Sequence, residues 1–304
     1  MTGPSACCSI QSTGFLLALS QDWVIAAVSA NIADFVACDH QALIGRPASD
    51  LLTDDAVHTL RNRLALLRDP EAVERLFACE LTHDKRTFDV AIHCSGNLTI
   101  IEAEPASART FGDVTATLRG MFARIDLAAN LDDFLGEASC QMRALTGFEQ
   151  VLILRLLPDH SGEVLAQHAR AGVPSMIGKR IAADWLSLGE RHALQHSAVH
   201  VSTDLAAELI PLLAEGEPDL ARAILRPLTP ACRELFLDLG VRAVTLVALL
   251  VGGSLWGVVI CLHRQPRSPG FERRSIIDLF AQLLAPRIEN LELKAALAEA
   301  DRSG

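Results

Sequence analysis

The sequence predicts an α+β protein of two domains, each a central antiparallel sheet flanked by helices, with a long helix at the C-terminal end. The chain has 304 residues and half of them are apolar, which is about twice the material that one hydrophobic core needs. After residues 105–109 the apolar spacing changes from a period of about two to one of about 3.6. Between residues 243 and 263, Gly252-Gly253-Ser254 interrupts a long apolar segment, which predicts a hairpin.

Short apolar runs separated by turn residues make up the first domain, which we place at residues 9–105. Strands are expected at 15–20, 24–29, 76–82, 87–93 and 98–104, and short helices at 32–36 and 54–68. Two strands, small helices and then three strands is the order of a PAS domain.

Two amphipathic helices begin the second domain, which we place at residues 110–285, and strands follow at 151–156 and 162–168. The helix at 271–304 overlaps the end of this domain, and we expect it to be a signalling and dimerisation helix. Its heptad-like stripe predicts pairing with a second copy of the chain, and Pro286 predicts a kink. The stripe consists of Ile277, Phe280, Leu284, Ile288, Leu291, Ala295 and Ala298.

Composition and motifs exclude several classes of function. A net charge of −10 without a long basic run argues against binding to nucleic acid. The longest apolar stretch is too short to span a bilayer and the chain does not begin with a signal sequence, so we expect a cytoplasmic protein. No nucleophile, phosphate-loop or kinase signature is present, so we expect no enzyme activity.

Five short segments, taken in order, resemble the PAS-GAF core of bacteriophytochromes. They are Ser9-Ile10-Gln11, Leu145-Thr146-Gly147-Phe148, Gly162-Glu163-Val164, Gly240-Val241-Arg242-Ala243 and Leu255-Trp256-Gly257. The resemblance implies a GAF domain after the PAS domain and a sensory role in signal transduction. In that family a biliverdin chromophore lies in the GAF pocket, tethered to a cysteine near the N-terminus, and a downstream output domain such as a histidine kinase receives the signal.

Compared with the family, several pocket positions are altered. The resemblance places remnants of the bilin pocket at Asp184, Arg226, Cys232 and His263. Cys232 stands where the family has a histidine, and Leu262 stands where a histidine is expected at the outer ring of the chromophore. The family's tyrosines map to Leu154 and Leu235, and its second propionate-binding arginine aligns near His200. The segment Ile10-Gln11-Ser12-Thr13-Gly14 lacks the family's preceding attachment cysteine.

These departures lead to three hypotheses. The first is a sensory module that has lost covalent biliverdin binding and senses redox state through Cys8, Cys232 and Cys261. The alternative is a photoreceptor that binds biliverdin without a covalent bond, through Asp184, Arg226 and His263. The third is a dimerisation module that transmits a signal through its C-terminal helix.

Three histidines recur every four residues, at His192, His196 and His200. Such spacing is typical of metal ligands on one helix face, but no carboxylate or cysteine completes the set. We therefore expect no metal site.

Overall fold

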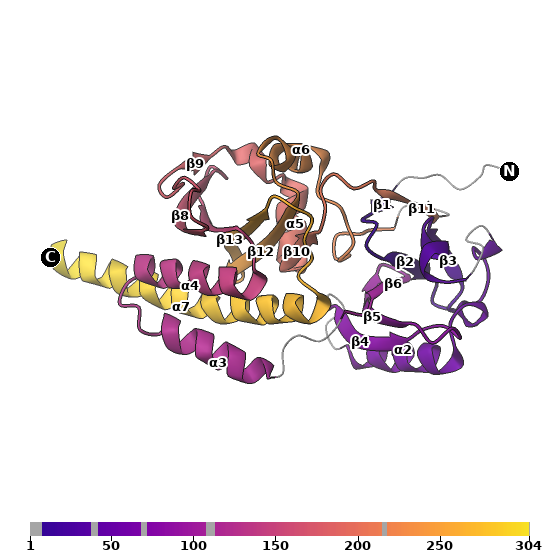
Figure 1. The fold of residues 1–304 in the computed structure, drawn as a ribbon. Coiled ribbons are helices and arrows are strands. Elements are labelled where there is room, and N and C mark those ends of the chain that lie inside the picture. Colours follow the sequence, from indigo (N-terminus) through magenta and orange to yellow (C-terminus); the bar gives the residue numbers. More distant parts are fainter. Residues whose placement is uncertain (1–7, 38–41, 68–71, 108–112, 215–217, 304) are drawn as a thin grey trace. The chain divides into compact units, whose positions relative to one another are not determined.

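The computed structural model describes residues 8–37, 42–67, 72–107, 113–214 and 218–303. Contacts divide the chain into two compact units (Figure 1). The first unit contains residues 1–108 together with 206–227, and the second contains residues 109–205 and 228–304. The domain limits expected from the sequence, 9–105 and 110–285, did not anticipate that residues 206–227 pack with the first unit.

A seven-stranded antiparallel sheet forms the centre of the first unit, in the order β1-β11-β3-β2-β6-β5-β4. Its strands are β1 (Ser9–Ile10), β2 (Phe15–Leu19), β3 (Ile25–Ser29), β4 (Glu74–Glu80), β5 (Thr87–Ser95), β6 (Leu98–Pro105) and β11 (Ile210–Ala214). The accompanying helices are α1 (Ile32–Phe35), η2 (Ala48–Asp50) and α2 (Asp54–Leu66). Phe15 and Phe88 meet edge to face in the core, with ring centroids 5.4 Å apart.

Strand β11 is far in sequence from the other strands of this sheet. It pairs with β3, where Leu213 lies opposite Val28, and with β1, where Pro211 lies opposite Ser9. The backbone N–H of Gln11 donates to the carbonyl of Leu225, and its side chain donates to the carbonyl of Arg226. The segment 206–227 is therefore an integral part of the first unit.

In the second unit a six-stranded antiparallel sheet has the order β10-β12-β13-β7-β8-β9. Its strands are β7 (Gln150–Leu156), β8 (Gly162–Ala169), β9 (Arg180–Ile181), β10 (Val199–Ser202), β12 (Ala243–Val251) and β13 (Ser254–His263). The expected hairpin is present as β12 and β13. Gly252 and Gly253 at its turn have φ values of 58° and 78°, a conformation that favours glycine.

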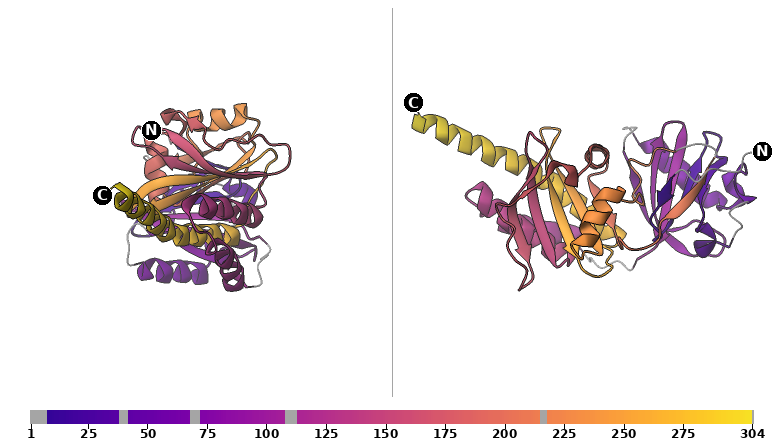
Figure 2. Two further views of the ribbon diagram at one scale, coloured as in Figure 1. Left: turned by 90° about the vertical axis from the view of Figure 1, so that its left-hand side faces the viewer. Right: turned by 90° about the horizontal axis from the view of Figure 1, so that it is seen from above.

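Helices cover both faces of this sheet, as Figure 2 shows for the second unit. One face packs against α4 (Leu131–Thr146) and α7 (Phe271–Ser303), and α3 (Val114–Ile125) packs on these two helices. The other packs against η3 (Ala183–Trp185), α5 (Leu188–His196) and α6 (Pro230–Asp238). Side chains that alternate along β7, β12 and β13 enter the two cores in turn, as the period of a strand requires.

The expected interaction stripe of the C-terminal helix lies mostly inside its own unit. Ile277, Phe280 and Leu284 are at most 1% exposed and belong to the core beneath α7. The prediction was therefore wrong about which face is available, because the sheet of the same unit already covers that stripe. The exposed stripe contains Leu279, Leu283, Leu293 and Leu297. The helix continues through Pro286.

Within the described residues, no helix combines the length and apolar character that crossing a membrane requires.

Candidate functional site

The sheet face beneath α5 and α6 carries a dense apolar cluster, which we call the α5–α6 core. It contains Leu152, Leu154, Val164, Trp185, Leu186, Leu194, Leu205, Leu228, Cys232, Phe236, Val241, Val244, Leu246, Ala248, Val258, Ile260 and Leu262. Every member is at most 8% exposed. These side chains come from four strands, from the helices above them and from the connecting loops.

Trp185 is the largest side chain of this core. A Cβ atom at position 162 would lie 3.3 Å from the indole Nε1 of Trp185 and 3.0 Å from Cδ2 of Leu154. Gly162 therefore gives the indole the space to approach the strand. The buried Nε1 has no hydrogen-bond partner among the described residues, which is unfavourable for a polar group in an apolar core.

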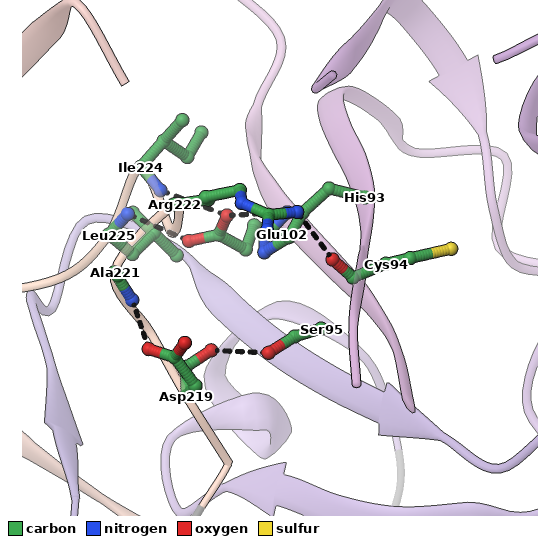
Figure 3. Close-up of polar contacts among 9 residues, drawn as sticks. All are labelled: His93, Cys94, Ser95, Glu102, Asp219, Ala221, Arg222, Ile224 and Leu225. Carbon is green, nitrogen blue, oxygen red and sulfur yellow. Dashed lines mark hydrogen bonds and ion pairs between the residues drawn. The ribbon is translucent and has the colours of Figure 1, made fainter. Parts of the chain in front are cut away.

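A second buried cluster lies in the first unit, where β5 and β6 meet the segment 219–225 (Figure 3). Glu102 on β6 is fully buried. Its carboxylate accepts hydrogen bonds from the backbone N–H groups of Ile224, at 2.9 Å, and Leu225, at 2.7 Å. Arg222 donates to the carbonyl of Cys94 at 3.0 Å. Together these contacts hold the inserted segment to the sheet.

His93 on β5 is a neighbour of Glu102 in this cluster. Its Nδ1 lies 4.0 Å from the carboxylate, which is too far for a hydrogen bond. The ring is fully buried, and neither nitrogen has a hydrogen-bond partner among the described residues. Burial, followed by the charge of Arg222, lowers the pKa of His93 to about 4, although Asp219 opposes the shift. At neutral pH the imidazole is therefore uncharged.

Comparisons with known proteins agree with this architecture. A family profile described as the PAS fold matches residues 6–106, and a second, the GAF domain, matches residues 130–290, more than half of the chain. The bacteriophytochrome of Pseudomonas aeruginosa is 27% identical over 305 residues, covering 93% of this chain and 39% of that protein. The phytochrome-like protein Cph1 of Synechocystis is 25% identical, covering 95% of this chain and 41% of that protein.

The chain belongs to the GAF family, as a PAS–GAF module of bacteriophytochrome type. A solved chromophore-binding domain of an unusual bacteriophytochrome from R. palustris superimposes with a TM-score of 0.81 at 25% identity, covering 95% of this chain and 97% of that structure. These findings confirm the fold class expected from the sequence. The module spans about two fifths of the length of the two curated relatives named above.

The remnant pocket residues of the GAF domain are dispersed. Asp184 is exposed in η3, whereas Cys232 is buried in the α5–α6 core. His263 lies on the opposite face of the sheet from Leu262, where its ring meets Phe148 edge to face at 5.8 Å. Arg226 is buried in the segment that packs with the PAS domain. Asp184 and Cys232 therefore lie on elements that contact each other, η3 and α6, whereas the ring of His263 lies on the other face of the sheet.

A tetrapyrrole does not fit the α5–α6 core as it is packed. Leu154, Cys232 and Leu262 stand at family pocket positions, and each is at most 8% exposed. If they lined a cavity of bilin size, these side chains would present surface to the space inside it. Leu154 and Cys232 are at most 2% exposed and present no such surface. Leu262 borders a cavity of only about 290 Å³, which Val241 and His263 also line.

Two of the proposed redox thiols lie on opposite faces of the GAF sheet. Cys232 belongs to the α5–α6 core, whereas Cys261 packs beneath α4 and α7. Burial raises the pKa of the Cys261 thiol to about 12, although a hydrogen bond with Thr146 opposes the shift. Cys8 is half-buried in the PAS unit, and its Sγ lies 3.9 Å from the carbonyl oxygen of Pro218. No disulfide involves any of the six cysteines in the part of the chain that the structure describes.

The three regularly spaced histidines separate into a pair and a single residue. His192 and His196 lie on α5 with their Nε2 atoms 3.1 Å apart. His200 is buried on β10, where its Nε2 is 3.0 Å from the hydroxyl of Ser202. Across the part of the chain that the structure describes, no group of three potential metal ligands is found.

Sequence reasoning missed the cluster around Glu102. A charged residue inside the apolar strand 98–105 was the available signal, because a carboxylate in a buried strand requires hydrogen-bond donors. The donors come from Ile224 and Leu225, more than one hundred positions away, and no local pattern pointed to them.

Proposed function

We propose that this PAS–GAF module is the sensory input part of a phytochrome-like receptor that works without a bilin. The observation that carries the proposal is the packed α5–α6 core, which occupies the sheet face carrying the altered pocket positions. A bilin bound there would need partners for its propionates and pyrrole nitrogens, and each buried polar group left unpaired costs about 1–3 kcal/mol. Leu154 and Leu262 supply none.

Biliverdin binding tests this proposal directly. The purified, reduced chain is mixed with biliverdin, and absorbance spectra are recorded before and after red and far-red illumination. The bacteriophytochrome of Pseudomonas aeruginosa, treated identically, is the positive control. We expect no photoconvertible far-red band from this chain. Such a band would contradict the proposal and favour the alternative photoreceptor, in which Asp184, Arg226 and His263 hold biliverdin without a covalent bond.

The signal would leave through α7. Leu279, Leu283, Leu293 and Leu297 are between 41% and 66% exposed, and their offsets of four, fourteen and eighteen residues follow a heptad repeat. We infer that this stripe pairs with a second copy of the chain in the cytoplasm. An output domain such as a histidine kinase would then receive the signal, and any catalysis would belong to that domain.

The oligomeric state tests the proposed helix pairing. Light scattering after size exclusion should report a dimer for the unmodified chain and a monomer for the double variant Leu293→Glu/Leu297→Glu. Leu127→Glu is the matched control, because Leu127 is 85% exposed and lies outside α7. If the double variant remains as dimeric as the control, the exposed stripe is not the interface.

Redox sensing is the second candidate, and we place it on Cys8. Among its three proposed thiols, Cys8 is half-buried, whereas Cys232 and Cys261 are at most 2% exposed. Oxidation requires an accessible thiolate, which favours Cys8. The oligomeric state and the signal to the output domain should then differ between reducing and oxidising conditions, and Cys8→Ser should abolish the difference. Identical behaviour under both conditions would exclude the redox hypothesis.

A further inference from the structure

A cavity of about 980 Å³ opens at the end of the GAF sheet, on the side of α5. The β7–β8 turn, the first turns of α5 and the start of β13 form its walls. Its volume is at the upper end of the range of small-molecule sites, about 300–1,000 Å³. The lining residues are Arg155, Leu156, Leu157, Pro158, His160, Leu188, Gly189, Arg191, His192, Gln195, Ser254, Leu255 and Trp256.

One part of the lining is apolar and the other is basic. Leu156, Leu188 and Trp256 contribute to the apolar wall, and Leu188 is 75% exposed. The basic part consists of Arg155, Arg191 and two histidines, His160 and His192. None of the described lining residues is acidic. The lining is therefore more basic than the chain as a whole, which has 37 acidic and 27 basic residues. The charge of the cavity therefore complements an anion.

The two carboxylates nearest to the cavity in the sequence accept hydrogen bonds from groups outside its lining. Asp159 accepts hydrogen bonds from the backbone N–H and the hydroxyl of Ser161. Glu190, in the first turn of α5, is 1% exposed and accepts a hydrogen bond from the backbone N–H of Thr229 at 2.7 Å. Neither carboxylate lines the cavity, so the first turn of α5 presents its positive dipole end there.

Arg191 is the strongest indication of a missing partner. Its Nη1 atom is buried, and no described residue accepts a hydrogen bond from it. A buried donor without an acceptor is costly, and guanidinium groups bind carboxylates and phosphates particularly well. Because Nη1 is shielded from water, an anionic group in the cavity would first meet the part of the half-buried Arg191 side chain that lines the cavity, and a shift of the side chain would bring Nη1 to the same acceptor.

We propose that this cavity binds a soluble amphipathic anion, a single apolar chain or ring system that ends in a carboxylate or phosphate. The apolar body lies against Leu156, Leu188 and Trp256, and the anionic group is bound by Arg191. The cavity is distinct from the α5–α6 core, because no lining residue is one of the buried members of that core, although Leu156 and Leu255 pack against it.

Contacts of Arg155 connect the cavity to α7. Its guanidinium lies 5.6 Å from the ring centroid of Trp256 and 2.9 Å from the carboxylate of Glu292 on α7. The indole Nε1 of Trp256 donates to the same carboxylate at 3.1 Å. An anion near Arg155 therefore competes with Glu292, which gives the bound ligand a route to the helix that leaves the domain.

Calorimetric titration of the 304-residue chain with three probes tests the site. Dodecanoate has both the charge and the apolar body, dodecanol has the body alone, and acetate has the charge alone. We expect dodecanoate to bind with a stoichiometry of one to one. Dodecanol should bind at least about tenfold more weakly, and acetate should show no measurable binding. Equal binding of dodecanol and dodecanoate would overturn the proposal, because the surface would then be only an apolar patch.

Matched variants locate the binding. Arg191→Gln should weaken dodecanoate about tenfold, whereas Arg119→Gln, an equal change of charge at an exposed position on α3, should not. Glu292→Gln should strengthen binding by up to about fivefold, because it frees Arg155 and still accepts from Trp256. Identical affinities for Arg191→Gln and Arg119→Gln would overturn the proposal. Near-ultraviolet circular dichroism establishes that each variant is folded.

Sedimentation with phosphatidylglycerol vesicles distinguishes a soluble ligand from a membrane lipid. We expect the chain to remain in the supernatant. Co-sedimentation that is lost in Arg191→Gln would overturn the proposal of a soluble ligand in favour of a lipid headgroup at a membrane surface.

Discussion

His93 should make the stability of the PAS unit depend on pH in a predictable direction. In the unfolded chain its pKa is about 6.5, and in the folded chain burial lowers the pKa to about 4. Between these values the unfolded state binds more protons, so stability is lost as the pH falls. From about pH 7.5 to about pH 4.5 this group alone removes about 2.5 kcal/mol from the free energy of unfolding.

Replacing His93 by a residue that does not titrate should remove this pH-dependent contribution to stability. Between about pH 7.5 and about pH 4.5 the unmodified chain loses stability from all its titrating groups. His93→Leu should lose about 2.5 kcal/mol less, because the contribution of this imidazole is absent. At neutral pH the variant should be no less stable, because the two unpaired nitrogens are gone. Urea unfolding at a series of pH values, followed by circular dichroism, measures both effects. His83→Gln, at an exposed histidine, is the control and should retain the full dependence.

Two results would refute this reasoning. Equal pH dependence in His93→Leu and the control would mean that burial does not shift the pKa of His93. A loss of stability as the pH rises, present in the unmodified chain and absent in His93→Leu, would mean that the folded state holds an imidazolium. Glu102 would then form an ion pair with it across the 4.0 Å separation.

Three further predictions concern other buried positions. Glu102→Gln should reduce the free energy of unfolding by about 1–3 kcal/mol, since a neutral amide replaces the carboxylate that accepts from Ile224 and Leu225; an unchanged urea midpoint would contradict this. Gly162→Ala should cost about 1–3 kcal/mol and alter the fluorescence of Trp185, because the new Cβ crowds the indole and Leu154; a variant as stable as the unmodified chain would show that the core is loosely packed. Cys261 should resist alkylation by iodoacetamide at about pH 8 until the chain unfolds, because burial raises the pKa of its thiol to about 12. Mass spectrometry of the labelled native protein detects any earlier reaction, and rapid labelling would contradict the buried environment.

Local patterns in the sequence were sufficient for much of the fold. The paired glycines at 252–253 predicted the hairpin of β12 and β13, because few other residues adopt positive φ values in a tight turn. The change to a period of about 3.6 after residues 105–109 predicted the two amphipathic helices that are α3 and α4, and the order of strands and small helices predicted the PAS domain. These features depend on neighbours within one or two turns of the chain, so the sequence contains the information locally.

Only the tertiary structure decided where distant segments meet. Strand β11 joins the PAS sheet from within the GAF sequence, and Glu102 finds its donors at Ile224 and Leu225, contacts that no local pattern specifies. The helix α7 has two apolar stripes, and packing alone determined that Ile277 and Phe280 are covered while Leu293 and Leu297 are exposed. The sequence by itself determined the spacing of apolar residues along each strand and helix, and the positions of the turns. Folding determined which faces are covered, because burial depends on segments that approach one another only in three dimensions.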